Sequence, residues 1–406
     1  MCERLLHNSP TVSRAILAIV AVTQLAFAAT ASAQAQMEFI PSVSLFTVYD
    51  DNIFARVTGS AGQMQQLRPS FEGSYESPTV RMLGLYSFDM QRSNFSSLNT
   101  LDARRHALGE TRLRTNPFST LGVTGRYDRS EVPGDIDVDT GSLGERRTAE
   151  RLELTPTFAR RVSTRTVIST AYNWTTEHLV DGERGTLHTG RVGWSQDITS
   201  KTTIGGSYVA RYFVDHRANH SSHAALLSWN RVLGPGMRVT LSAGPKITSY
   251  GGADLETSAA FARATPHANL ALDYWHGETI VLGVLGPVGV DSLSSRMSWP
   301  IKRRFEFGTH TGVSDISAID GRTSRIYRGT LVGSWAPHPM YTVATTYGLD
   351  LQDGTIRQPL FLDDQPLPLD DHVLRQVFRV SVTVAPRYKR SILPPEEAAR
   401  AKGVTR

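Results

Sequence analysis

A period-two alternation of apolar and polar side chains is the feature that most constrains this chain, and it recurs in short stretches from residue 38 onward. In one clear stretch, Tyr86 and Phe88 alternate with Ser87 and Asp89. Successive side chains of a β-strand point to opposite faces of a sheet, so each stretch predicts a strand with one apolar and one polar face. The pattern therefore predicts an all-β chain. It does not separate a membrane barrel from a soluble β-sandwich, whose strands also alternate.

The connections between the strands favour a barrel. Tight turns with turn-forming residues are predicted at 77–78, 116–117, 162–165, 197–201, 234–236, 276–278 and 337–339. Longer polar segments lie between them, at 50–63, 92–101, 131–147, 215–222, 251–260, 315–325 and 352–372. Short turns at one end and long loops at the other are typical of antiparallel barrels in bacterial outer membranes. We therefore expect short periplasmic turns and long extracellular loops.

The number of strands follows from parity. A first count gives about 17 strands, but bacterial barrels of this kind close with an even number. In the segment 279–312, the run Trp299-Pro300-Ile301-Lys302 interrupts a supposed strand, and Pro287-Val288-Gly289 is a candidate for an unusually short outer loop. Dividing it gives a closed antiparallel transmembrane β-barrel of about 18 strands, with about 16 as the alternative, and places both chain ends in the periplasm.

The N-terminus reads as a secretory signal. Arg4 and Arg14 precede an apolar stretch from residue 15 to 29, and Ala31-Ser32-Ala33 follows as a cleavage site. An N-terminal anchor is the less favoured alternative. We expect a signal peptide at 1–33, a barrel at 34–386 and a periplasmic tail at 387–406. After residue 33 no stretch approaches the roughly 20 apolar residues of a membrane helix.

Composition narrows the function classes. Cys2 is the only cysteine and lies in the expected signal peptide, so disulfides and thiolate metal sites are excluded from the mature chain. The formal net charge is +5, and 38 of the 43 basic residues are arginines. These arginines are scattered among nearly as many carboxylates in an exported chain, so no nucleic-acid partner is expected.

Candidate binding residues come from the polar strand faces. Arginines on these faces could bind acidic sugars or phosphates through bidentate contacts in a lumen; they are Arg81, Arg126, Arg191, Arg211, Arg328 and Arg379. The alternative is that they only pair with interior carboxylates such as Asp89, Asp128 and Asp350. On the apolar face, aromatic residues predict girdles at the membrane boundaries; they are Tyr86, Phe88, Tyr127, Trp194, Tyr212, Trp335 and Tyr341.

Neither catalysis nor a cofactor is predicted. The sequence has no G-x-S-x-G or H-E-x-x-H motif. Asp215, His216, His220 and His223 resemble a metal-binding set only loosely, because they lie on a loop entering a strand. The acidic segment 134–139 lacks the spacing of an EF-hand. We therefore expect no catalytic residue, no metal and no cofactor.

The run Tyr49-Asp50-Asp51-Asn52-Ile53-Phe54 closes the first expected strand. It resembles the signature of the outer-membrane barrels called putative β-barrel porin 2, and a looser resemblance extends over 38–386, through turns such as 196–203. The resemblance implies a barrel associated with export of exopolysaccharide or capsular polysaccharide. A simpler interpretation of the run is that Asp and Asn cap a strand through nearby backbone groups. The chain departs from many outer-membrane barrels because eighteen residues follow the last aromatic residue, Tyr388.

The leading hypothesis is a passive outer-membrane pore that contains no energy source. Its expected partners are outer-membrane lipid, an anionic polysaccharide and periplasmic export components. The alternatives are a structural or adhesive barrel and an outer-membrane hydrolase with its active site at the rim.

Overall fold

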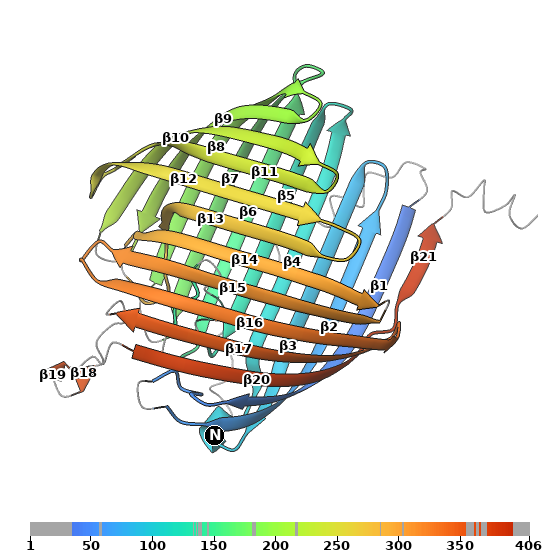
Figure 1. Ribbon diagram of the computed structural model, residues 1–406, viewed down its shortest axis with the longest axis vertical. Coiled ribbons are helices and arrows are strands. Elements are labelled where there is room, and N and C mark those ends of the chain that lie inside the picture. The colour runs from blue at the N-terminus through green and yellow to red at the C-terminus, as the bar shows by residue number, and fades with distance from the viewer. Residues whose placement is uncertain are drawn as a thin grey trace, which may run out of the picture.

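In the computed structural model the chain forms one closed antiparallel β-barrel (Figure 1). The structure describes residues 35–392, apart from 57–58, 133, 135, 137–139, 144–145, 181–183, 216–217, 285, 303, 355–360, 363–364 and 367–371. The expected signal peptide and most of the expected tail lie outside the described residues. No helix among the described residues is long and apolar enough to cross a membrane.

The barrel wall consists of the strands β1–β17 and β20. Their bounds, with those of the minor elements, are β1 Ala35–Asp50, β2 Gly62–Glu76, β3 Val80–Ser93, η1 Ser96–Leu98, β4 Thr100–Asn116, β5 Ser119–Ser130, β6 Ala149–Arg161, β7 Thr166–Leu179, β8 Arg184–Thr199, β9 Thr202–Val214, β10 Asn219–Gly234, β11 Met237–Thr248, β12 Gly252–Ala264, β13 Asn269–Thr279, β14 Val288–Lys302, β15 Phe305–Ala318, β16 Thr323–His338, β17 Tyr341–Gly354, β18 Phe361–Leu362, β19 Gln365–Pro366, β20 His372–Val384 and β21 Tyr388–Ile392. The predicted fold class and the count of 18 wall strands are confirmed.

Closure takes place where β1 meets β20. Each wall strand pairs antiparallel with its neighbour in the chain, and β20 pairs on one edge with β17 and on the other with β1. The β1–β20 register joins Val43 to Val384 and Asp50 to Val377. Because the sheet closes on itself, each wall strand has a partner strand on both sides.

β21 lengthens the seam. It pairs antiparallel with the first residues of β1, from Ala35 opposite Ile392 to Phe39 opposite Tyr388. The paired wall therefore continues past residue 386, the boundary that the sequence suggested. The reason is the length of β1, which extends beyond the end of β20 and leaves backbone groups for β21 to bond.

Short turns and long loops lie at opposite ends of the barrel. The turns at 77–79, 117–118, 162–165, 200–201, 235–236 and 339–340 agree with the sequence analysis. The predicted turn at 276–278 is wrong because these residues belong to β13, and the predicted loop at 251–260 is wrong because β12 begins at Gly252. The true turn is 265–268, closed by bonds between Thr265 and Ala268.

The structure divides the segment 279–312 at two connections, as the sequence analysis predicts a division there. A connection at 280–287 precedes β14, and a two-residue turn after Lys302 leads into β15. However, Trp299 and Pro300 do not interrupt a strand, because β14 continues through them with an irregularity between Pro300 and Lys302. A bulge near a strand end tolerates a proline that lacks an N–H donor.

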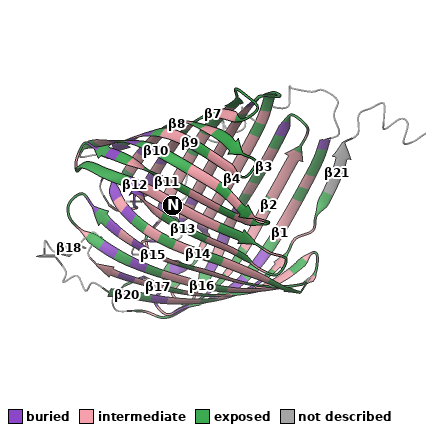
Figure 2. Ribbon diagram, turned by 45° about the horizontal axis from the view of Figure 1, so that its top comes forward, coloured by how far each residue is buried: buried purple, intermediate pink, exposed green. Residues whose placement is uncertain are grey.

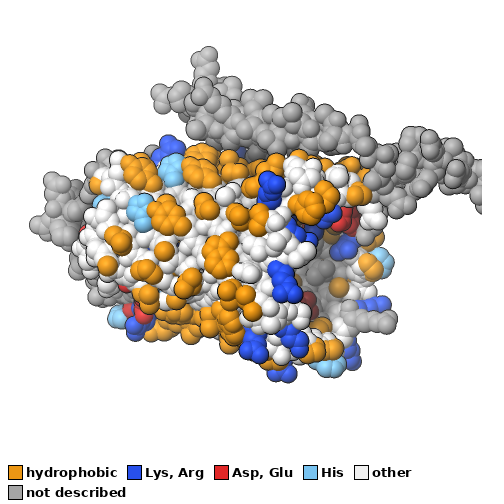
Figure 3. Space-filling view, turned by 90° about the horizontal axis from the view of Figure 1, so that it is seen from above, with side chains coloured by type: hydrophobic (Ala, Val, Ile, Leu, Met, Phe, Trp, Pro, Cys, Tyr) orange, Lys and Arg blue, Asp and Glu red, His pale blue; other side chains and the backbone are white. Residues whose placement is uncertain are grey.

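The barrel is apolar on its outer surface. Large hydrophobic side chains such as Val192, Leu227 and Ile247 are 55%, 73% and 63% exposed there. Polar residues including Asp89, Gln91 and Asp128 are buried. Along the wall strands in Figure 2, buried or intermediate residues alternate with exposed ones. In the view of Figure 3, hydrophobic side chains are spread over the outer wall, and Lys and Arg gather toward the short-turn end. A closed barrel with this distribution satisfies its backbone groups internally in an apolar environment.

We expect heat-modifiable migration of the refolded protein in SDS gels. An unheated sample should migrate faster than a boiled one, because a closed barrel stays compact until heat breaks its backbone ladder. Identical mobility of both samples would contradict closure.

Candidate functional site

The described residues of the loop between β5 and β6, which are 131–148 apart from 133, 135, 137–139 and 144–145, fold into the lumen. Its Ile136 and Leu143 are only 1% and 2% exposed. The Gly141 carbonyl accepts a hydrogen bond of 3.0 Å from Arg328 on β16, and the Leu143 N–H donates one of 2.7 Å to Gln352 on β17. These partners lie on strands that are not adjacent to β5 or β6, so the loop crosses part of the lumen.

The loop between β13 and β14, residues 280–287, also turns inward. Its Val281 packs with Val288, Ile316 and Ile326 in a buried apolar cluster. Ile280 packs on Leu187 of β8 and Phe213 of β9. The β12–β13 ladder ends at the pair Thr257–His276, after which β13 leaves β12. The end of β13 thus bends across the lumen.

A buried ion cluster holds this bend. Lys246 of β11 places its Nζ 3.0 Å from Glu278 of β13 and 3.0 Å from Asp254 of β12, and the Lys246 and Glu278 side chains are each 3% exposed. Tyr250, in the turn after β11, lies against Glu278. Burial, followed by the nearby Glu278 carboxylate, raises the pKa of Tyr250, so its phenol stays neutral.

Beneath the inward loop 131–148 lies a cavity of about 330 Å³, here called the arginine-rich cavity. It is bounded by strands on both sides of the seam and by the loop itself. Three carboxylates line it, from Asp89, Glu131 and Asp350. Six arginines line it as well, namely Arg68, Arg104, Arg146, Arg328, Arg375 and Arg379.

Several arginines of this cavity form more than one hydrogen bond. Arg68 donates two hydrogen bonds to Asp89, of 2.5 and 2.7 Å. Arg328 donates to Asp350 at 3.0 Å in addition to its bond with the loop. Arg379 lies over the Phe46 ring, 5.7 Å from its centre. A guanidinium carries five N–H donors, so an arginine that holds a carboxylate retains donors for a second anion.

A second cavity, of about 380 Å³, lies beneath the loop 280–287. Arg126, Arg151 and Arg211 line it together with Glu153 and Glu278. Arg211 forms two bonds of 2.7 Å with Glu256. Arg126 pairs with Asp128 of its own strand and Arg151 with Glu177 of the adjacent β7, whereas Glu256, the partner of Arg211, lies three strands away on β12. Each arginine thus pairs with a carboxylate of the inner face, as polar barrel interiors generally show.

The structure distributes the six arginines of the sequence analysis over the lumen. Arg328 and Arg379 line the arginine-rich cavity, and Arg126 and Arg211 line the second. Arg81 and Arg191 share the inward-facing parity of their strands but line neither of these cavities, and neither forms an ion pair with another described residue. Of the three suggested partners, Asp128 pairs with Arg126 and Asp350 with Arg328, whereas Asp89 pairs with Arg68.

Sequence reasoning missed four arginines of the arginine-rich cavity. Arg146 lies on a loop, where no periodicity marks an inward side chain. Arg375 lies among the first residues of β20, just after the predicted loop 352–372. Arg68 and Arg104 lie on strands β2 and β4 and could have been found by extending the alternation to those strands.

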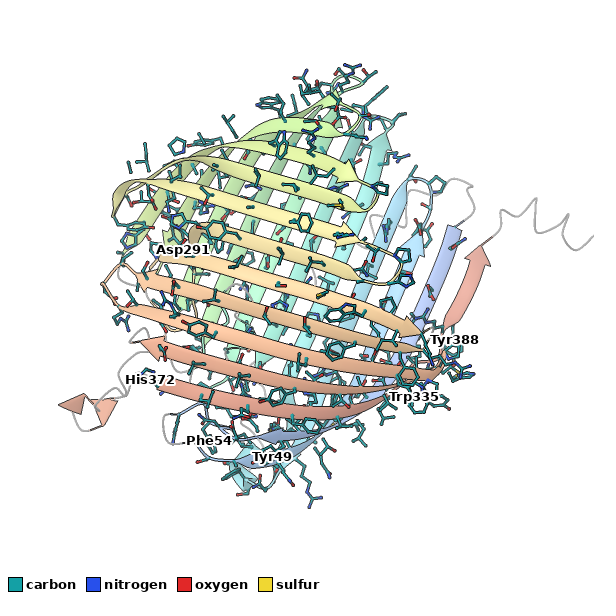
Figure 4. All side chains as sticks on the ribbon, viewed as in Figure 1. Tyr49, Phe54, Asp291, Trp335, His372 and Tyr388 are labelled. Atoms are coloured by element: carbon teal, nitrogen blue, oxygen red, sulfur yellow. The ribbon has the colours of Figure 1, made fainter. Side chains whose placement is uncertain are left out.

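The run Tyr49–Phe54 joins the end of β1 to the start of β20 (Figure 4). Asp50 is fully buried and accepts three hydrogen bonds from Arg375, the shortest 2.7 Å. Asp51 accepts a bond of 2.6 Å from the Gln376 N–H. Asn52 Nδ2 donates to the Leu374 carbonyl at 2.9 Å. The run therefore caps β1 and fastens the seam.

The remaining residues of the run pack instead of bonding. Ile53 is 1% exposed and lies among Phe46, Val48 and Met64. Phe54 makes an edge contact with Phe95 at 5.3 Å between ring centres. Tyr49 points outward and is 46% exposed. The run thus contains one outward-facing tyrosine and three polar residues that bond to β20. Its last two residues are apolar and pack at the loop end of β1.

Girdle aromatics lie on the outer face. Tyr86, Trp194, Tyr212, Trp335 and Tyr341 are all between 42% and 45% exposed. Phe305 stacks on Trp335 at the short-turn end, with ring centres 5.9 Å apart. Amphipathic rings at this level are typical of a membrane interface.

One row of side chains bears on the hydrolase alternative. Ser87, His106 and Asp128 lie opposite one another on β3, β4 and β5, and His106 Nδ1 is 2.6 Å from Asp128. Ser87 forms no hydrogen bond with His106, and Asp128 also accepts from Arg126 at 2.5 Å. A nucleophile needs its base within hydrogen-bond reach. Asp128 thus holds His106 and Arg126, and the row contains no hydrogen bond between a nucleophile and its base.

No group of three or more His, Cys, Asp or Glu side chains suited to a metal occurs among the described residues. His216 and most of the acidic segment 134–139 lie outside those residues. His223 faces outward and bonds to the Tyr208 hydroxyl at 2.7 Å. His220 instead packs edge-on against Tyr250. These two histidines thus have separate partners.

No protein-family model matches the sequence, and no curated protein matches it. Solved structures resemble its barrel at low identity. OccK7 of Pseudomonas aeruginosa is 11% identical, with 88% of this chain and 100% of that chain covered and a TM-score of 0.45. OccAB4 of Acinetobacter baumannii is 7% identical, with 88% and 99% covered and a TM-score of 0.46. The siderophore receptor PirA of P. aeruginosa is 10% identical, with 86% and 80% covered and a TM-score of 0.40.

These similarities concern the barrel and no residue of either cavity. The specific family that the Tyr49–Phe54 run suggests therefore stays a prediction.

Replacing Arg375 with Ala should lower the free energy of unfolding by about 3–5 kcal/mol, because it leaves the buried Asp50 carboxylate without its partner. The double variant Asp50→Ala/Arg375→Ala should lose less than the sum of the two single changes. Urea unfolding in detergent, followed by tryptophan fluorescence, measures this. Arg325→Ala, which removes an exposed pair with Asp315, is the control and should change stability little. Equal effects of Arg375→Ala and the control would contradict the importance of the seam pair.

Gly141→Ala should release loop 131–148 from β16. Gly141 has a φ of +69°, and a Cβ there would lie 2.8 Å from Cζ of Arg328. We expect faster tryptic cleavage after Arg146 or Arg147 in the folded variant. Gly109→Ala, where a Cβ meets no atom within 4 Å, is the control. Unchanged cleavage in Gly141→Ala would show that this contact does not hold the loop.

Proposed function

We propose that this protein is an outer-membrane channel for small hydrated solutes that carry negative charge. The observation that carries the proposal is the arginine-rich cavity, which lies between the closed barrel wall and the inward loop 131–148. An apolar outer surface with a polar interior suits a barrel that separates lipid from a watery path. The two inward loops narrow that path, which favours small solutes over large ones.

Charge supports the preference for anions. Six arginines and three carboxylates line the arginine-rich cavity. Asp50, which is fully buried at the end of β1, binds Arg375 and adds a fourth carboxylate. The described residues thus carry more positive than negative charge at this point. Guanidinium groups bind carboxylates and phosphates in bidentate geometry, which gives such solutes a defined resting place.

A second, more specific proposal concerns which solute crosses the barrel. The resemblance of the Tyr49–Phe54 run implies an exopolysaccharide or capsular polysaccharide, and an acidic polysaccharide is one anion that arginines would bind. Arginines in both cavities, such as Arg211 and Arg328, would contact successive acidic sugars of such a chain. In that case the barrel would work with periplasmic export components. This cargo stays a prediction.

Planar-bilayer recordings of the refolded protein test the proposal. We expect conductance with a preference for Cl⁻ over K⁺. Arg104→Gln/Arg379→Gln should lower the permeability ratio about 30-fold, since each of the two unit charges contributes about 1 kcal/mol at about 4 Å in water. Arg231→Gln, on the outer wall, should leave the ratio unchanged.

Adding competing solutes in the same recordings distinguishes between the two proposed substrates. A small dicarboxylate that interrupts the current while an acidic oligosaccharide does not would support a small-solute channel. The reverse would support the polysaccharide. Folded protein that conducts nothing, or that prefers cations, would contradict the proposed function.

A further inference from the structure

Two apolar grooves meet on the outer wall between β4 and β9. One, of about 790 Å³, lies at the short-turn end and is lined by Phe118, Phe158, Val162 and Ile168. The other, of about 460 Å³, continues toward the middle of the wall and shares Phe158. Phe118 and Val162 are 62% and 52% exposed, so the floor of the first groove is open to its surroundings. Both volumes fall in the range typical of small-molecule sites.

The short-turn end of the first groove is basic. Arg160 and Arg161 line it, together with the polar turn residues Asn116, Ser163 and Thr164. No carboxylate occurs among the residues that line either groove. Neither Arg160 nor Arg161 forms an ion pair with another described residue. The groove therefore offers guanidinium and hydroxyl donors at one end and an apolar channel beyond them.

The level of the groove on the barrel fits a membrane boundary. Ile168 lies opposite Trp194 in the β7–β8 ladder, and the Trp194 ring is 43% exposed on the outer face. Exposed tryptophans mark the level of lipid headgroups in membrane barrels. The apolar part of the groove thus lies on the membrane side of its basic end, where an acyl chain would follow a headgroup.

We infer that this groove binds one anionic phospholipid of the periplasmic leaflet. Arg160 holds the phosphate, Ser163 and Thr164 donate to headgroup oxygens, and the acyl chains lie along Phe158 and Ile168 toward the second groove. This inference rests on the proposed placement of the barrel in a membrane. It does not depend on what the lumen conducts.

Native mass spectrometry of the full chain, released from detergent with added phosphatidylglycerol or phosphatidylcholine, tests the site. We expect one phosphatidylglycerol to be retained in preference to phosphatidylcholine. Arg160→Gln should weaken its retention about fivefold, since one basic side chain near an anionic surface contributes about that factor. Val162→Trp, which fills the groove but keeps Arg160, should also abolish retention.

The matched control is Arg231→Gln, which removes one arginine from the same end of the wall outside the grooves. An equal loss in this control would show general surface attraction and overturn the site. Equal retention of phosphatidylcholine, or full displacement by free glycerol phosphate, would overturn it as well. Each variant is checked for heat-modifiable migration and conductance. If a variant loses the lipid but conducts normally, the lipid site is independent of the channel function. If the protein binds the lipid but does not conduct, only the proposed channel function is contradicted.

Discussion

The structure depends on the hydrogen-bonded closure between β1 and β20. An apolar surrounding offers no partner for backbone N–H and C=O groups, so a sheet stands in it only when it has no open edge. The ladder from Val43–Val384 to Asp50–Val377 provides that closure, and β21 lengthens it. At the loop end, Asp50 and Arg375 add a buried ion pair between the two edges. The strands that are farthest apart in the sequence are thereby joined.

Closure divides the side chains into two environments. Outward positions are apolar and end in aromatic residues near the boundaries, whereas inward positions carry the charges. Space inside the wall is then filled by the loops 131–148 and 280–287, which bring their own apolar residues and bury polar ones. The result is a lumen made of separate cavities, with arginines placed by strand register around them. The proposed selectivity for anions follows from this placement, and the proposed lipid site follows from the outward face.

The sequence predicted the fold because alternation and turn chemistry are local signals. Residues such as Tyr327 and Arg328 reveal their faces through their immediate neighbours, and parity then corrected the strand number. The segment 276–278 was misread because Gly277 resembles a turn glycine, while the strand bends there for a tertiary reason, the ion cluster around Lys246. Thr265 and Pro266 carried the true turn signal at the other end of β13.

The site was only partly predictable. Strand arginines such as Arg211 could be assigned to the inner face, but the partner Glu256 is fixed by register across several strands. Arg375 and Asp50 are 325 residues apart, and only closure of the barrel brings them together. The inward course of loop 131–148 has no periodic signal, because its contacts with Arg328 and Gln352 are single hydrogen bonds to distant strands.

Hydrogen–deuterium exchange of the protein in lipid bilayers tests closure most directly. The account predicts slow exchange for the amides of Val43–Asp50 and Val377–Val384, comparable to that of β8 and β9 in the middle of the chain. Exchange in both seam segments as fast as in the loop 280–287 would show an open sheet and contradict the account.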